Sequence, residues 1–144
     1  MRRVVLVLVA FAALVGCREV RVDQVLTGTT TVLGPTQVVV VRDKRNLEGL
    51  GISATPDFRK EFAVALLMGP HRETGYEQHI ESIRANADRV RIVAFERAPI
   101  DGGDPTTPYR TYTIWFVPNI AYRPGTPVDV VTPSGDPVAT TTVR

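Results

Sequence analysis

The chain has 144 residues, of which 44% are hydrophobic and 22% charged, and its formal net charge is +2. This length fits one ordinary domain, and the two fractions exclude an intrinsically disordered chain. The single cysteine excludes an intramolecular disulfide and any zinc or iron–sulfur site built from several cysteines.

The first seventeen residues have the pattern of a bacterial lipoprotein signal. Two arginines precede the unbroken apolar run Val4–Val15. A membrane-spanning helix needs about 20 such residues, so this run matches the apolar core of a secretory signal peptide instead. It ends in Leu14-Val15-Gly16-Cys17, which is similar to a lipobox, where the cysteine is acylated and the signal is cleaved before it. We predict a signal peptide over residues 1–16 and a lipid anchor on Cys17; an ordinary secretory signal is the alternative.

The signal also accounts for the positive charge of the chain. Removing residues 1–16 takes away Arg2 and Arg3, which leaves 15 basic and 15 acidic residues in a mature chain of 128. A neutral domain without a basic stripe has no means of neutralising phosphates, so we expect no nucleic-acid partner. Two or three acyl chains would hold it firmly on a membrane, which predicts a bacterial cell-envelope protein that faces the periplasm or the exterior.

After the signal, short β-rich segments alternate with glycine, proline, aspartate and asparagine. The predicted strands are Glu19–Leu26, Val38–Val41, Ala63–Met68, Glu77–Ala85, Arg89–Arg97, Thr111–Val117, Val128–Val131 and Val138–Val143. Asn46 is expected to cap one short helix that runs to Leu50 and stops at Gly51. The pattern predicts a mainly β domain, an antiparallel β-sandwich or a partly open barrel with one short helix.

Two loops follow strands that a hairpin separates, so we expect them at one end of the sheet. The first, residues 69–76, begins where the apolar run stops at Gly69-Pro70, and the second is Pro99–Pro108. Gly75 is expected to adopt a positive φ, and Tyr76 to turn its ring inward with its hydroxyl on a backbone partner. Pro108 is expected to hold the start of the next strand. Both loops are either structural corners or a shared binding edge.

The segment from Phe62 to Val117 resembles the C-terminal domain of the protease complex subunit PrcB family. The resemblance covers 56 residues and rests on the apolar strand that ends in Gly69, on Thr74-Gly75-Tyr76, on Thr107-Pro108-Tyr109 and on the upstream Asp57-Phe58. Glu73 and Thr74 depart from the Pro-Thr-Gly or Thr-Gly-Gly that the family often has. The resemblance implies an accessory lipoprotein of a surface protease assembly that is not itself the peptidase.

Together these patterns divide the chain into three parts. Residues 1–16 are the signal peptide, residues 17–28 a lipidated tether with the first strand, and residues 29–144 a PrcB-like β-domain with a C-terminal hairpin. We predict a non-catalytic protein without cofactor or bound metal that binds a protein partner, with a peptidase as the candidate. The candidate binding residues are His71, Arg72, Glu73, Thr74, Gly75, Tyr76, Thr107, Pro108 and Tyr109.

A cysteine peptidase inhibitor and an enzyme are the two alternative functions. Thr74-Gly75-Tyr76 is similar to a loop of chagasin-type cysteine peptidase inhibitors, and Asp101-Gly102-Gly103 to their glycine-rich loop. The Asn-Pro-Thr and Arg-Pro-aromatic motifs of those inhibitors are missing. An enzyme would need a nucleophile, but none of the serines Ser53, Ser82 and Ser134 lies in a Gly-x-Ser-x-Gly turn.

The titratable residues that an enzyme or a metal site would use are His71, Glu73, Glu77, His79 and Glu81. Glu77, His79 and Glu81 would share one strand face with about 7 Å between neighbours, which is too wide to converge on one ion, and His71 would have to fold back to complete a site. We therefore expect a solvated face that pairs with Arg89, Arg91 and Arg97 across the hairpin.

Overall fold

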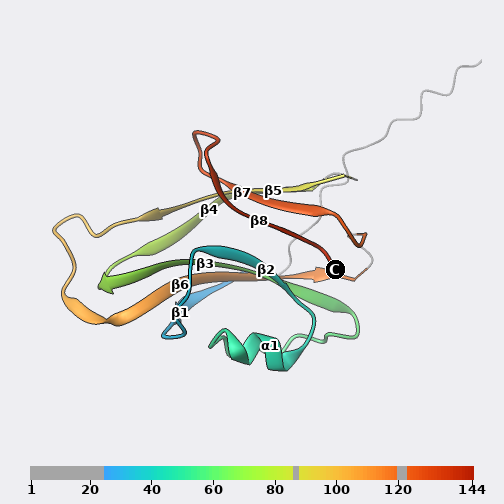
Figure 1. Ribbon diagram of the computed structural model, residues 1–144, viewed down its shortest axis with the longest axis horizontal. Helices are drawn as coiled ribbons and strands as arrows, with labels where there is room; N and C mark the ends of the chain where they lie inside the picture. Colours follow the sequence, from blue (N-terminus) through green and yellow to red (C-terminus); the bar gives the residue numbers. More distant parts are fainter. Residues whose placement is uncertain (1–24, 86–87, 120–122) are drawn as a thin grey trace, which may run out of the picture.

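The computed structural model describes residues 25–85, 88–119 and 123–144 (Figure 1). The predicted signal peptide, Cys17 and the part of the first predicted strand before Val25 lie outside these residues. Within the described ranges, no helix is long and apolar enough to cross a membrane.

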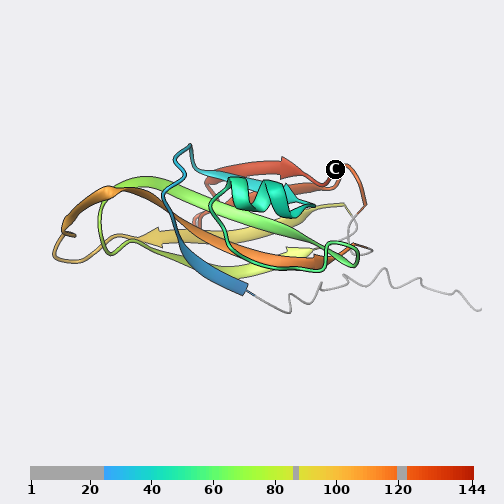
Figure 2. The ribbon, with the colours of Figure 1, turned by 90° about the horizontal axis from the view of Figure 1, so that it is seen from below.

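The described residues form two four-stranded sheets that lie face to face (Figures 1 and 2). Sheet A has the order β1-β6-β3-β2, with β1 at Val25–Thr30, β6 at Pro105–Pro118, β3 at Glu61–Glu73 and β2 at Gln37–Val41. Sheet B has the order β4-β5-β7-β8, with β4 at Glu77–Ala85, β5 at Val90–Arg97, β7 at Pro127–Val131 and β8 at Pro137–Thr142. The predicted mainly β fold is confirmed as a sandwich with one short helix. The terminal hairpin is part of sheet B, because β7 pairs in parallel with β5.

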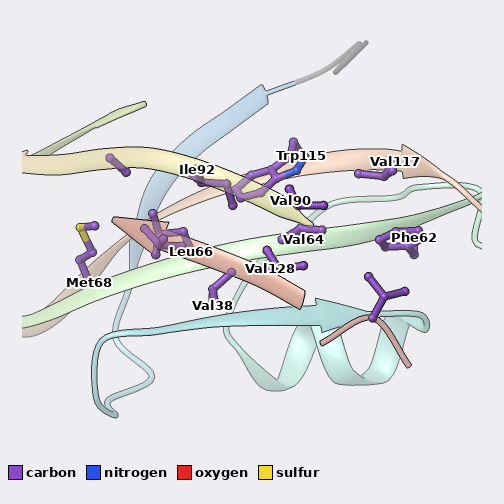
Figure 3. Packing of buried hydrophobic residues seen from close by; sticks show 13 residues of the cluster. Val38, Phe62, Val64, Leu66, Met68, Val90, Ile92, Trp115, Val117 and Val128 are labelled. Carbon is purple, nitrogen blue, oxygen red and sulfur yellow. The ribbon is translucent and has the colours of Figure 1, made fainter. Parts of the chain in front are cut away.

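Two apolar clusters explain the unbroken hydrophobic run of β3. Phe62, Val64 and Leu66 point into the space between the sheets, where Trp115 of β6 and Ile92 of β5 meet them (Figure 3). The alternate residues of β3, Ala63, Ala65 and Leu67, point to the opposite face of sheet A, where they pack with Leu47 of the helix and with Ile52. Both faces of β3 are therefore buried, which removes the usual alternation of apolar and polar residues.

The helix α1 (Lys44–Gly49) begins earlier than predicted. Its N-cap is Asp43, whose extended backbone (φ −148°) leaves its carboxylate free to accept the Asn46 backbone N–H at 2.8 Å. Asn46 lies inside the first turn, and its side-chain amide donates to the other Asp43 oxygen at 2.6 Å. The prediction of Asn46 as the cap was wrong because Lys44 and Arg45 are good helix formers that extend the helix back to an equally good capping residue.

Two central strands are longer than predicted. β3 does not stop at Gly69-Pro70 but continues to Glu73, and β6 already begins at Pro105. Register shifts on both sides of His71 accommodate Pro70, which has no N–H to offer the ladder. Thr107, Pro108 and Tyr109 therefore lie in β6 and not in a loop.

A buried arginine holds the segment between β1 and β2. The side chain of Arg110 is 1% exposed, and its guanidinium donates to the carbonyl oxygens of Val32 (2.8 Å) and Pro35 (3.1 Å). A Cβ on Gly34 would lie 3.0 Å from the guanidinium, so glycine permits this close approach. Burial lowers the pKa of Arg110 from its ordinary value. Arg110 thus connects the segment that leads into β2 with the interior of β6.

Candidate functional site

The two loops singled out in the sequence meet at one end of the sandwich. We call this surface the loop end; it consists of Thr74–Tyr76 between β3 and β4 and residues 98–104 between β5 and β6. The backbone N–H of Thr74 donates to the Asp104 carbonyl at 2.9 Å, and the Asp104 N–H donates to the Thr74 hydroxyl at 3.1 Å. A Cβ on Gly103 would lie 1.9 Å from the Thr74 carbonyl oxygen. The two segments are therefore in direct backbone contact.

The turn between β3 and β4 has the predicted backbone. Gly75 has a φ of 93°, and a Cβ at this position would approach Pro99 of the other loop to 3.0 Å. The ring of Tyr76 stacks on the His71 imidazole with 3.8 Å between centroids and an interplanar angle of 12°. Tyr109 completes the aromatic group at 5.7 Å from His71, and its hydroxyl donates to the Glu73 carbonyl at 2.9 Å.

A polar network between the sheets supports this aromatic group. The His71 Nε2 lies 2.8 Å from a Glu96 carboxylate oxygen that also accepts the Thr111 hydroxyl. The Gln78 amide donates in turn to the Thr111 hydroxyl and carbonyl, both at 2.9 Å. The His71 and Glu96 side chains are only 11% and 16% exposed. His71 is thus held by ring stacking on one partner and by a hydrogen bond to another.

Glu96 was not singled out in the sequence, although a signal for it exists. In β5 the residues Val90, Ile92 and Ala94 alternate into the core between the sheets, and Glu96 continues the same period of two. A carboxylate on the buried face of a strand requires a hydrogen-bond partner, and here His71 and Thr111 supply it.

The remaining candidate residues occupy the rim of the loop end and the adjoining strands. Arg72, Glu73, Thr74, Gly75 and Thr107 are exposed, and Pro108 is partly buried. The sequence reading missed Ile100, at the tip of the β5–β6 loop, whose side chain is 93% exposed. Nothing in the local pattern distinguishes it, because exposure at a loop tip depends on where the loop points.

The structure does not gather the titratable residues into one cluster. His71 lies between the sheets, whereas His79 stacks on Phe95 (5.1 Å) and Glu77 lies 3.8 Å from the His79 ring nitrogen. Glu81 falls at the register shift between Ile80 and Ser82. Across the described residues, no group of three or more histidine, cysteine, aspartate or glutamate side chains is placed to hold a metal ion.

The predicted charge pairing across the β4–β5 hairpin is met at Arg97 and not at Arg91 in the strand register. Arg97 lies opposite Glu77, as expected. Arg91 lies instead opposite Arg84, and Arg89 forms an ion pair with Asp129 of β7 at 3.1 Å. The difference arises because β7 pairs in parallel with β5, which brings an acidic residue beside the start of β5.

Comparison with known proteins adds no family assignment. No family model matches the chain, and neither a curated protein nor a solved structure matches it. The resemblance of residues 62–117 to the PrcB C-terminal domain stays a prediction.

Proposed function

We propose that this chain is a non-catalytic cell-envelope lipoprotein, anchored through an acylated Cys17, whose β-sandwich binds a protein of an envelope peptidase complex through the loop end. The observation that carries the proposal is the loop end itself, in which two loops far apart in the sequence are locked together by reciprocal Thr74–Asp104 hydrogen bonds. Beside these hydrogen bonds, the β5–β6 loop carries Ile100, whose side chain is 93% exposed.

The rigid structure beneath the loop end favours a binding role for this surface. Loops that carry recognition are positioned by a stiff scaffold, and a preorganised loop loses little conformational entropy when a partner docks. The stack of Tyr76 on His71 and the hydrogen bond from His71 to Glu96 provide that scaffold beneath the surface. Burial of an exposed isoleucine side chain by a partner contributes about 1.5–3 kcal/mol.

The contacts of His71 favour a structural role over a catalytic one. Its Nε2 is engaged by Glu96, its ring face by Tyr76, and the same Glu96 oxygen also accepts the Thr111 hydroxyl. A general base must be within hydrogen-bond reach of the proton that it removes from a substrate. These contacts instead direct the imidazole and the carboxylate toward each other.

The binding role can be tested with matched exposed variants of the full chain. Ile100→Asp changes the loop end, whereas Leu33→Asp changes another exposed apolar side chain, 54% exposed, in the β1–β2 segment. We expect a peptidase subunit to co-purify from membranes of the producing bacterium with the parent chain and with Leu33→Asp, but not with Ile100→Asp. Equal recovery with both variants, or no peptidase subunit with the parent chain, would contradict the proposal.

The anchor is tested separately. Cys17→Ser in the full chain is expected to abolish incorporation of a labelled fatty acid and to release the protein from the membrane fraction. Labelling that persists in this variant would show that Cys17 is not the acylated residue. The outcome does not depend on the role of the loop end.

One contact favours the inhibitor as a second candidate. Thr74 and Gly103 are in direct contact, so the Thr74-Gly75-Tyr76 turn lies beside the Asp101-Gly102-Gly103 segment. Titration of papain with the full chain and with Tyr76→Ala tests this function. An inhibitor requires loss of papain activity that weakens in the variant, and undiminished papain activity would eliminate it.

A further inference from the structure

The four edges of the two sheets differ in how they are protected. Sheet A ends in β1 and β2, and sheet B ends in β4 and β8. An edge strand exposes unpaired backbone N–H and C=O groups, and proteins block such edges with charges, prolines, bulges or a covering segment. Comparison of the four edges therefore indicates which of them is open to another strand.

Three edges carry such protection. β4 has a register shift between Ile80 and Ser82 and carries charged side chains along its length. β8 begins with Pro137, where its pairing with β7 is irregular. β2 lies beside β8, and the Arg42 guanidinium donates to the carbonyl of Arg144 at the end of the chain. Each of these edges is thus bulged, interrupted or flanked by another segment.

Among the described residues, the edge of β1 has none of these features from Val25 to Thr29. Only its last residue is covered, because the Thr30 hydroxyl donates to the Leu50 carbonyl at 2.8 Å. Its residues, Val-Leu-Thr-Gly-Thr-Thr, include no charge and no proline. The pairing of β1 with β6 is regular from Val25↔Trp115 to Thr30↔Arg110, and no other described strand lies outside β1 (Figure 2). Two large apolar side chains on it, Val25 and Leu26, are 48% and 44% exposed. β1 is therefore a regularly paired, uncharged and partly apolar edge.

We infer that β1 pairs antiparallel with β1 of a second copy of this chain, so that the two copies of sheet A join into one continuous sheet. A two-fold axis that relates antiparallel strands stands perpendicular to the sheet, so residues on the same face meet. A pairing centred on Thr27 places Thr27 against Thr27 of the second copy and Val25 against Thr29. Such β-branched cross-strand pairs are favourable, and the absence of charge removes repulsion between identical strands.

The opposite face of β1 is complementary to itself in the same register. Leu26 would lie across from Gly28 of the second copy, which has no side chain. The space above Gly28 is already bounded by the Tyr112 ring, because a Cβ on Gly28 would lie 2.6 Å from the Tyr112 hydroxyl. The exposed Leu26 side chain would thus contact the edge of that ring, and this fit favours a second copy over an unrelated strand.

The experiment uses the full chain, purified in mild detergent, and compares two edge strands. Thr27→Cys places thiols opposite each other at the two-fold axis, and Thr142→Cys places one on β8 as the matched exposed control. The parent chain gives the background from Cys17. We expect Thr27→Cys to form a disulfide-linked dimer on mild oxidation, whereas Thr142→Cys stays at the parent background.

A charge at the same position gives the second measurement. Thr27→Lys sets two like charges against each other, so we expect the parent dimer, measured by light scattering, to be lost in this variant and kept in Thr142→Lys. A circular dichroism spectrum like that of the parent chain, together with cooperative thermal unfolding, shows that Thr27→Lys is folded, whereas its melting temperature is expected to fall as the dimer is lost. A monomeric parent chain, a dimer that survives Thr27→Lys, or capture of a different protein through residue 27 by a monomeric chain would each overturn self-pairing.

Discussion

Replacement of Gly103 by alanine tests whether the two loops are locked as described. A Cβ at this position would lie 1.9 Å from the carbonyl oxygen of Thr74, a backbone atom that cannot rotate away as a side chain can. The overlap is relieved only if the loops separate, which lengthens the two hydrogen bonds between Thr74 and Asp104. Overpacking costs about 1–3 kcal/mol, and this cost already includes the weakening of two hydrogen bonds worth about 1 kcal/mol each. We therefore expect a decrease in the free energy of unfolding in the upper part of that range, about 2–3 kcal/mol.

Two measurements follow from this magnitude. A domain of this size loses about 3–5 °C in melting temperature per kcal/mol, which gives a decrease of about 6–15 °C. Because about 1.4 kcal/mol is a factor of ten, local opening would speed hydrogen exchange of the Thr74 and Asp104 amides by about 30- to 140-fold.

The neighbouring glycine provides the control. Gly102 has a φ of 74° but nothing within 4 Å of a Cβ. Gly102→Ala therefore costs roughly 1–2 kcal/mol of backbone strain without pushing the loops apart. The Thr74 amide should keep its protection in this variant. If Gly103→Ala left the melting temperature and the exchange of both amides unchanged, the contact between the loops would not exist as described.

Four further substitutions test the supporting structure. Arg110→Met keeps a similar side-chain volume but removes the group that donates to two carbonyl oxygens. We expect the free energy of unfolding measured in urea to fall by about 2–3 kcal/mol. A decrease of less than about 0.5 kcal/mol would show that Arg110 does not hold the β1–β2 segment. Asp43→Ala should cost about 1 kcal/mol as the helix cap, whereas Asn46→Ala should be nearly neutral, and the reverse order would restore Asn46 as the cap. Glu96→Ala removes the acceptor for His71 and should cost about 2 kcal/mol, with a shift of the His71 ring resonances; unchanged resonances would contradict the contact.

Much of the strand content was predictable because it depends on neighbours in the sequence. The hairpin of β4 and β5 and the hairpin of β7 and β8 lie close to their predicted positions, and Gly75 has the expected positive φ. Alternation, turn residues and β-branched runs are local signals. The same reasoning misplaced the ends of β3 and β6, because their extension depends on the pairing of His71 with Tyr109, 38 positions apart.

The candidate site was predictable in part. The sequence indicated that two loops share one end of the sandwich, and the structure brings Thr74 and Asp104 into contact. It did not indicate Glu96 beneath His71 or Ile100 at the tip, because the first depends on which strand covers β3 and the second on the direction of a loop.

The sequence by itself determined a mainly β domain with its turns at glycine, proline and aspartate positions, and it predicts an export signal ahead of that domain. Only the tertiary structure decided which strands share a sheet, that β7 runs parallel to β5, and that Arg110 is buried under the β1–β2 segment. Local propensity fixes the conformation of a segment, whereas strand order and buried polar partners depend on contacts between distant residues. The open edge of β1 is likewise decided by the tertiary structure, because a strand is an edge only when the order of the other strands in the sheet is set.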